Sequence, residues 1–283
     1  LMGGSQMRIN KGLTVQFHSN AVTMMYVEKE LNFVQRKKVN DEQIEQVISE
    51  MIENLRTKIE ETRMERIDTY ITLPYEKVRI YTMLKFPDFE GLKGSKLNQA
   101  LQLHLENELE LKLEKPIYYY HTYETEQKKW MTVSVIDEKE ISLYPKMLFE
   151  KKFNLVKIQL EPDSIREYAV KNQIISSNDT VVFMHFFFDG EEKQVGFYIY
   201  KGDFLAAIRY LPMDYYDYLT ITNELDLVVK DCKKEIEDFE VSLYCVISEE
   251  KKDHDNLKMY LENKNYTFIH EKYPSSKGLL NIV

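Results

Sequence analysis

The sequence predicts a mixed α/β protein built from two lobes of similar element order. The chain has 283 residues, enough for two ordinary domains, and its 43% hydrophobic content is typical of globular proteins. An order of three strands, a helix and a strand occurs twice, over residues 12–73 and 180–247. A small polar linker, residues 172–178, separates the two halves. These observations indicate two related lobes.

The first repeat begins with three short strands of apolar and β-branched residues. They span Gly12–His18, Ala21–Val27 and Leu31–Val34. We expect Asn40 to cap a long helix, because apolar residues recur every three to four positions from Ile44 to Ile59. This helix must bury one face against a sheet. The strand Ile67–Leu73 completes the repeat.

A different pattern lies between the two repeats. Its predicted elements are the strand Val78–Phe86, a helix from Ser95, the hairpin strands Tyr118–Tyr123 and Trp130–Ile136, and a helix from Asp137. Pro145 predicts a kink in the last helix. The strand Leu155–Leu160 and a helix from Pro162 to Val170 then follow.

The second repeat has the same order as the first. Its predicted elements are the strands Thr180–Phe188, Gln194–Tyr200 and Phe204–Arg209, a helix with Leu225, Val229, Cys232, Ile236 and Phe239 on one face, and the strand Val241–Ile247. A helix around Leu257–Leu261 and a short strand, Tyr266–Ile269, close the chain.

Duplicated units of this order build the two-lobed actin/ribonuclease-H-like fold, in which two mixed sheets face each other across a cleft. We therefore predict this fold with a small α+β insertion in the first lobe. Lobe one comprises residues 7–74 and 154–172, the inserted unit residues 75–153, and lobe two residues 178–283. Lobe two is too short to hold the extra subdomain that usually clamps a nucleotide base.

Composition disfavours several classes of function. With 38 basic and 47 acidic residues the net charge is −9, which disfavours nucleic acid as the main ligand. The longest apolar run, Thr180–Phe188, is far shorter than the ~20 residues of a membrane helix. We interpret Leu1–Gln6 as an expression remnant before Met7 and expect a soluble, cytoplasmic protein. Cysteine and histidine spacing predicts no metal site.

Several short strings accompany this element order. They are Asp68-Thr-Tyr-Ile-Thr-Leu-Pro74, Val78-Arg-Ile-Tyr-Thr-Met-Leu-Lys-Phe-Pro87, Glu108-Leu-Glu-Leu, Leu160-Glu-Pro-Asp163 and Arg209-Tyr-Leu-Pro212. Over nearly its whole length the chain thereby resembles the actin-like pilus and secretion platform family, which includes type IV pilus assembly protein PilM and the cytoplasmic part of general secretion pathway protein L. The resemblance implies a non-enzymatic scaffold that docks a short cytoplasmic segment of an inner-membrane protein. The assembly ATPase is a further candidate partner, and partners would hold the scaffold at the inner face of the cell membrane.

The positions that would bind nucleotide depart from the ATP-binding pattern. ATP-binding members of this superfamily carry Asp and Gly in each phosphate hairpin, because Asp organises Mg²⁺ and Gly lets backbone N–H groups approach phosphate. Gln16 and His18 stand in the first hairpin and His185 in the second. Glu249-Glu250 replaces the Gly-Gly of the adenosine motif and would repel a triphosphate. We expect no nucleotide hydrolysis, no catalytic residue and no cofactor.

The 20 tyrosines leave two interpretations open, strand core or a protein-binding surface. On the second, a partner peptide docks on the inserted unit near its junction with lobe one. The candidate contacts are Tyr81, Leu84, Phe86, Tyr118 and Tyr120. Tyr81 differs in strand parity from Leu84 and Phe86, so only one of these sets can face the peptide unless a bulge intervenes. We favour the set that contains Leu84 and Phe86.

Two other functions stay open on the sequence. One is a divergent actin-like ATPase or sugar-kinase relative that binds nucleotide unconventionally. The other is an actin-like division or filament protein. A gene neighbourhood with pilin and assembly-ATPase genes would favour the scaffold over the filament protein.

Overall fold

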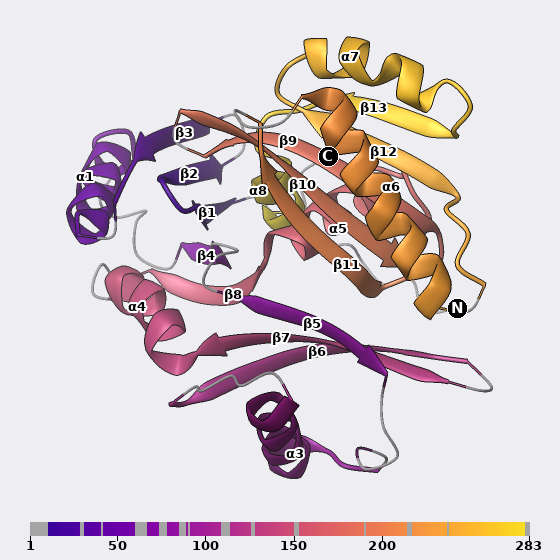
Figure 1. Ribbon diagram of the computed structural model, residues 1–283. Helices are drawn as coiled ribbons and strands as arrows, with labels where there is room; N and C mark the ends of the chain where they lie inside the picture. Colours follow the sequence, from indigo (N-terminus) through magenta and orange to yellow (C-terminus); the bar gives the residue numbers. More distant parts are fainter. Residues whose placement is uncertain are drawn as a thin grey trace, which may run out of the picture.

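The computed structural model describes residues 11–28, 31–40, 42–59, 67–73, 78–84, 89, 91–108, 114–125, 128–149, 153–189, 191–213, 217–236 and 238–280. They form two five-stranded mixed sheets and one three-stranded antiparallel sheet, with helices packed on their faces (Figure 1). In this part of the chain, every helix is too short or too polar to serve as a membrane span.

The sheet of lobe one has the strand order β3-β2-β1-β4-β8. Its strands are β1 (Lys11–Phe17), β2 (Ala21–Glu28), β3 (Leu31–Lys38), β4 (Asp68–Leu73) and β8 (Asn154–Leu160). The pairs β1–β2 and β2–β3 are antiparallel, whereas β1–β4 and β4–β8 are parallel. Helix α1 (Ile44–Arg56) packs on this sheet through the predicted apolar stripe, whose buried members are Ile44, Ile48, Met51, Ile52 and Leu55.

The start of α1 differs from the prediction. Asn40 Oδ1 accepts a hydrogen bond of 3.1 Å from the backbone N–H of Gln43, as a cap would. Gln43 itself holds the N-cap position, however, and its side chain makes no capping bond. A turn therefore separates Asn40 from the helix, and Asn40 does not hold the N-cap position predicted for it. Ile59 lies beyond the helix but is buried in the same core.

The sheet of lobe two has the strand order β11-β10-β9-β12-β13. Its strands are β9 (Thr180–Asp189), β10 (Glu192–Lys201), β11 (Phe204–Pro212), β12 (Leu243–Ser248) and β13 (Tyr266–His270). The pairs β9–β10 and β10–β11 are antiparallel, and β9–β12 and β12–β13 are parallel. Strand order and direction therefore match those of lobe one, which confirms the predicted repeat at the level of topology.

Helices cover both faces of this second sheet. Helices α6 (Tyr218–Glu235) and α7 (Lys252–Leu261) pack on one face, and α5 (Glu161–Lys171) packs on the other. The side chain of Asp217 caps α6 by accepting from the backbone N–H of Thr220 at 2.7 Å. Ile236 and Phe239 lie past the end of α6 rather than on its face, but both are buried in the same core.

Helix α8 (Pro274–Leu280) joins the two lobes and was not predicted. Leu279 and Leu280 are buried beside Met25 and Tyr70 of lobe one. At Gly278 a Cβ atom would lie 2.1 Å from the carbonyl oxygen of Ser164, so only glycine permits the close approach of α8 to α5. Pro and Gly weaken the helix signal of this short segment in the sequence.

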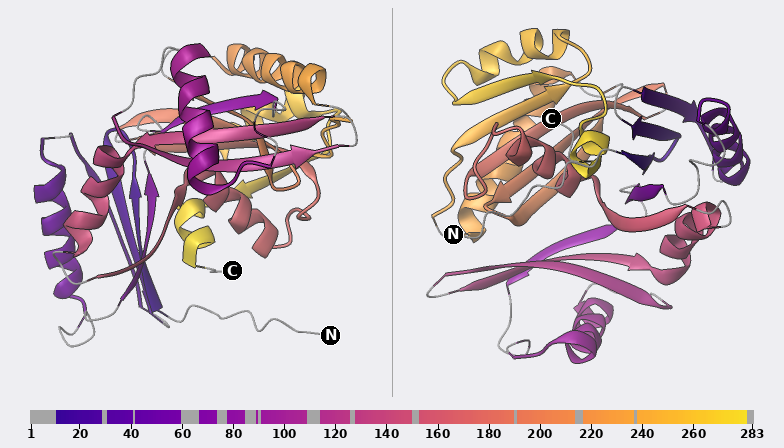
Figure 2. Two further views of the ribbon diagram at one scale, coloured as in Figure 1. Left: turned by 90° about the horizontal axis from the view of Figure 1, so that it is seen from below. Right: turned by 180° about the vertical axis from the view of Figure 1, so that it is seen from behind.

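The inserted unit is a three-stranded sheet with one helix on it. The strand order is β5-β7-β6, with β5 (Arg79–Leu84), β6 (Pro116–Glu124) and β7 (Lys129–Asp137). Helix α3 (Gly94–Glu108) lies across one face, as Figure 2 shows, and α4 (Glu138–Phe149) leads to β8 of lobe one. The predicted end of the first strand, residues 85–86, lies outside the described residues.

The other face of the inserted sheet meets lobe two. Trp130 on β7 is 2% exposed and belongs to the core of lobe two, and its Nε1–H donates to the backbone oxygen of Glu235 at 3.0 Å. The hydroxyls of Thr82 and Thr132 donate to backbone oxygens of β11, the edge strand of the lobe-two sheet. The inserted unit is thus fixed to both lobes.

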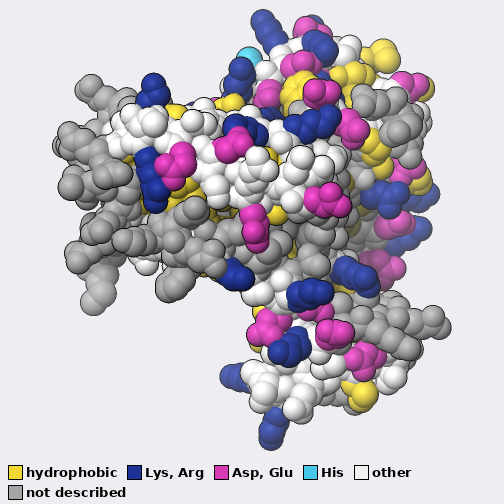
Figure 3. All heavy atoms as spheres, turned by 90° about the vertical axis from the view of Figure 1, so that its left-hand side faces the viewer, with side chains coloured by type: hydrophobic (Ala, Val, Ile, Leu, Met, Phe, Trp, Pro, Cys, Tyr) yellow, Lys and Arg dark blue, Asp and Glu magenta, His cyan; other side chains and the backbone are white. Residues whose placement is uncertain are grey.

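Charged side chains of both signs are interspersed over one face of the molecule. In the view of Figure 3, Lys and Arg alternate with Asp and Glu over the coloured part of the face.

Candidate functional site

Three of the predicted nucleotide-site residues meet between the lobes, where they contact other side chains of the chain. Gln16 Nε2, on β1, donates to Glu161 Oε1 at 3.1 Å. His185 Nδ1, on β9, lies 3.4 Å from the same oxygen, and Ser275 Oγ of α8 lies 3.5 Å from it. All of these residues are buried. The carboxyl group of Glu161, in the first turn of α5, therefore lies where β1 of lobe one and β9 of lobe two approach each other.

Aromatic rings extend this contact. The Phe187 ring stacks on His185, with centroids 4.9 Å apart, and on His18, with centroids 5.7 Å apart. Burial, and next the guanidinium of Arg36, lower the pKa of His185 to about 3. The same two causes, followed by His185, hold the pKa of His18 well below its usual range. Both imidazoles are neutral at pH 7 and offer no positive charge to a phosphate.

The two glutamates after β12 are held in ion pairs. Glu249 Oε1 lies 3.4 Å from Arg36 Nη1 of β3, which links the lobes. Glu250 Oε2 lies 3.0 Å from Lys193 Nζ on β10 and 2.9 Å from Lys252 Nζ. A further cross-lobe bond of 2.7 Å runs from the backbone N–H of Asn20 to Asp189 Oδ1. The two hairpins thus contact each other directly.

The described residues contain no group of three or more His, Cys, Asp or Glu side chains placed to hold a metal ion.

The predicted peptide contacts do not share one face of the inserted sheet. Tyr81 and Tyr120 both pair with Val133, and Tyr118 pairs with Val135, so these tyrosines lie on the face that α3 covers. Leu84 pairs with Trp130, which is three positions from Val133 along β7, so its register position belongs to the other face of the sheet. Phe86 lies outside the described residues. The register therefore separates Leu84 from the tyrosines, and Tyr81 belongs with Tyr118 and Tyr120.

A groove lies on the opposite face, at the junction of the inserted unit with lobe one. This junction groove has a volume of about 160 Å³. It is lined by Leu73, Val78, Ile117, Tyr119, Ser134, Ile136, Ile141, Lys157, Ile158, Gln159 and Leu160. Ile117 and Tyr119 line it and are exposed, although they are large and apolar or aromatic. An apolar groove with such a rim is typical of a protein-binding site.

Polar groups in the wall of the groove lack partners. Among the described residues, Gln159 Oε1 and Ser134 Oγ are buried and make no hydrogen bond. Buried polar atoms usually have a partner, so these two favour a ligand or water in the groove. Strand β8, which contributes Gln159, pairs with β4 alone in the described part of the chain. It is therefore an edge strand of the described sheet, and edge strands are the positions at which β-augmentation occurs.

Tyr119 adds a hydrogen-bond donor to the rim. The side chain is 52% exposed, on the face of β6 opposite Tyr118 and Tyr120. Partial burial and the carboxylates of Asp163 and Glu167 raise the pKa of Tyr119 to about 12. The hydroxyl stays protonated at neutral pH and can donate to a peptide carbonyl.

Comparison with known proteins identifies the fold. Neither a protein-family model nor a curated protein matches the sequence. The structure is similar to a chain of the PilM-PilN type IV pilus biogenesis complex, with a TM-score of 0.57 and 12% identity over 93% of this chain and 88% of that one. It is also similar to a Bacteroides thetaiotaomicron protein with an actin-like ATPase fold and unknown function (TM-score 0.53, 10% identity, 99% and 100% covered).

A third similar structure is the cytoplasmic domain of EpsL, an inner membrane component of the type II secretion system of Vibrio cholerae. Its TM-score is 0.53 and its identity 10%, with 96% of each chain covered. Together with the repeated sheet topology, these likenesses confirm the predicted actin-like fold.

Proposed function

We propose that this protein is a non-enzymatic scaffold of a type IV pilus or type II secretion assembly platform. In this role it binds a short cytoplasmic segment of an inner-membrane protein in the junction groove, and this partner holds it at the inner face of the cell membrane. The main support for this proposal is the groove itself, which combines an apolar lining, buried polar atoms without a hydrogen bond and an edge strand. The likeness to a chain of the PilM-PilN complex and to the EpsL domain supports the choice of partner class.

The geometry favours an extended peptide as the ligand. A segment alongside β8 can form backbone hydrogen bonds with that strand and place alternate side chains into the groove. Gln159 Oε1 can accept a backbone N–H, and Tyr119 can donate to a carbonyl. A volume of about 160 Å³ is below the ~300–1,000 Å³ of small-molecule sites, so it suits one or two side chains.

The contacts between the lobes support a role without nucleotide turnover. Glu161 places its carboxyl group where Gln16 and His185 converge, and the Asn20–Asp189 bond joins the two hairpins. A triphosphate there would meet carboxylates and neutral imidazoles rather than Lys, Mg²⁺ and glycine amides. The assembly ATPase remains a second proposed partner, which would supply the energy that this chain does not.

A peptide-binding experiment tests the scaffold. We would measure, by fluorescence anisotropy, the binding of labelled 15-residue peptides that cover the cytoplasmic segments of membrane proteins encoded beside this gene. We expect one peptide to bind, and the Tyr119→Ala change to weaken its Kd about thirtyfold, as loss of an aromatic contact of ~2 kcal/mol does. Tyr119 is half exposed, so the variant should keep its melting temperature.

Tyr120→Ala is the matched control, since Tyr120 is the next residue of the same strand and lies on the α3 face. It should leave the Kd unchanged. Loss of binding in Tyr120→Ala but not in Tyr119→Ala would move the site to the α3 face. Absence of any peptide that binds would contradict the proposed function.

A further inference from the structure

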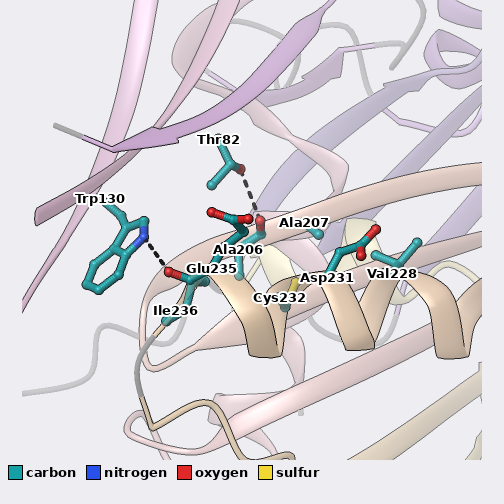
Figure 4. A pocket seen from close by; sticks show the side chains of 9 residues that line it. All are labelled: Thr82, Trp130, Ala206, Ala207, Val228, Asp231, Cys232, Glu235 and Ile236. Carbon is teal, nitrogen blue, oxygen red and sulfur yellow. Dashed lines mark hydrogen bonds between the residues drawn. The ribbon is translucent and has the colours of Figure 1, made fainter. Parts of the chain in front are cut away.

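A second groove lies farther along the same face of the inserted sheet, where the inserted unit meets α6 of lobe two (Figure 4). This α6 groove has a volume of about 260 Å³. It is lined by Thr82, Trp130, Ala206, Ala207, Val228, Asp231, Cys232, Glu235 and Ile236. It shares no lining residue with the junction groove. The two grooves are therefore separate surfaces.

The walls of the α6 groove are fixed by hydrogen bonds between the two units. Trp130 Nε1 donates to the backbone oxygen of Glu235, and Thr82 Oγ1 donates to the backbone oxygen of Ala206, both at 3.0 Å. Figure 4 shows these two bonds on either side of the space. A groove held in this way needs little ordering when a partner binds, which favours affinity.

The charge in this groove has one sign. Asp231 and Glu235 are one helical turn apart on α6, and no basic residue is among the lining residues. In Figure 4 the Glu235 carboxylate points into the space beside Thr82 and Ala206. Lys234 lies 3.3 Å from Asp231, but both side chains are exposed, so this pair is weak.

The remaining lining is apolar. Ala206, Ala207, Val228 and Ile236 form a floor that suits the aliphatic stem of a long side chain. Leu227, one turn before Asp231 on α6, is 54% exposed. Carboxylates beside an apolar floor complement Lys and Arg, which combine an aliphatic stem with a charged head.

We propose that the α6 groove docks a Lys or Arg side chain of a partner polypeptide, with a neighbouring apolar residue of that partner on Leu227. The volume of about 260 Å³ is again below that of small-molecule sites and suits a single long side chain. This inference does not depend on the junction groove: either site can exist without the other.

Selection of peptides from an unbiased library tests the proposal. The probe is a phage-displayed library of random 12-residue peptides, panned on the immobilised full chain, and enriched peptides are then synthesised for measurement of Kd. We compare the parent with the double variant Asp231→Asn/Glu235→Gln. The matched control is Asp255→Asn/Glu262→Gln, which removes the same charge from exposed positions at α7.

We expect an enriched class of peptides that contain Lys or Arg beside an apolar residue. Its Kd should weaken about tenfold or more in Asp231→Asn/Glu235→Gln, because charge-assisted hydrogen bonds are lost, and change little in the control. Raising the salt concentration should weaken this class as well. The proposal is overturned if no enriched peptide distinguishes the two double variants, or if the sensitive peptides lack a basic residue. Tyr119→Ala should not affect this class, which separates the two grooves.

Discussion

We expect the Trp130→Ala variant to lose about 3–5 kcal/mol of its free energy of unfolding, the usual cost of deleting a buried aromatic side chain. Trp130 extends from the inserted unit into the core of lobe two and is 2% exposed. The change leaves a cavity beside Phe204 and Ile236, and the backbone oxygen of Glu235 loses its donor. Trp130 is the only tryptophan in the chain, so the variant has no tryptophan fluorescence with which to follow unfolding. Urea unfolding monitored by far-ultraviolet circular dichroism therefore measures the loss of stability.

Two control variants show whether the loss of stability comes from the buried side chain of Trp130. Trp130→Phe keeps most of the buried apolar area and removes the N–H donor, so it should cost less than Trp130→Ala. Leu103→Ala truncates an exposed residue of α3 and should change stability by less than about 0.5 kcal/mol. A loss of less than about 1 kcal/mol in Trp130→Ala would show that the inserted unit is not packed on lobe two.

Acidification should destabilise the protein through its buried histidines. The pKa of His185 is about 3 in the folded protein and near 6.5 when unfolded, so between these values the unfolded state binds more protons. The histidine contribution to stability is therefore fully present above pH 6.5 and is lost as pH falls toward 3. At pH 5 the loss from His185 is about 2 kcal/mol. His18, whose pKa is also lowered, adds to it.

A variant isolates the contribution of His185. In His185→Gln, the decrease in unfolding free energy between pH 7 and pH 5 should be smaller than in the parent by about 2 kcal/mol, as measured by urea unfolding at each pH. His270→Gln, at an exposed position of β13, is the control. An identical pH dependence in the parent and His185→Gln would contradict a neutral, buried His185.

The repeated element order was predictable because strand and helix periodicities are local. Short runs of β-branched and apolar residues mark β1 and β2, and the apolar stripe of α1 indicates which face of that helix is buried. The topology follows from the repeat, since duplicated segments of one order form sheets of one order. Helix α8 was missed because its close contact depends on Gly278 meeting Ser164 of α5, more than a hundred residues away.

The candidate sites were predictable only in part. Gln16, His18 and His185 were identified by position in the repeat, and the structure brings them together. Glu161 was not identified, because nothing in its local sequence indicates that this helix residue contacts Gln16 of β1 and His185 of β9. The parity conflict between Tyr81 and Leu84 was visible in the sequence, but the pairing of β6 with β7 was needed to place Tyr118 and Tyr120 with Tyr81. The same register makes Tyr119, not its neighbours, the residue of the junction groove.

Thermal unfolding with and without millimolar Mg-ATP tests most directly whether an actin-like fold here serves as a scaffold without nucleotide. We predict the same melting temperature in both conditions, because Glu161, His18 and His185 lie between the first hairpins of the two lobes, where the fold would hold a nucleotide's phosphates. A ligand at 100 times its Kd would add ~2.7 kcal/mol to the unfolding free energy, which is readily detected. An increase in melting temperature that depends on ATP concentration and on Mg²⁺ would contradict the account and favour a nucleotide-binding enzyme.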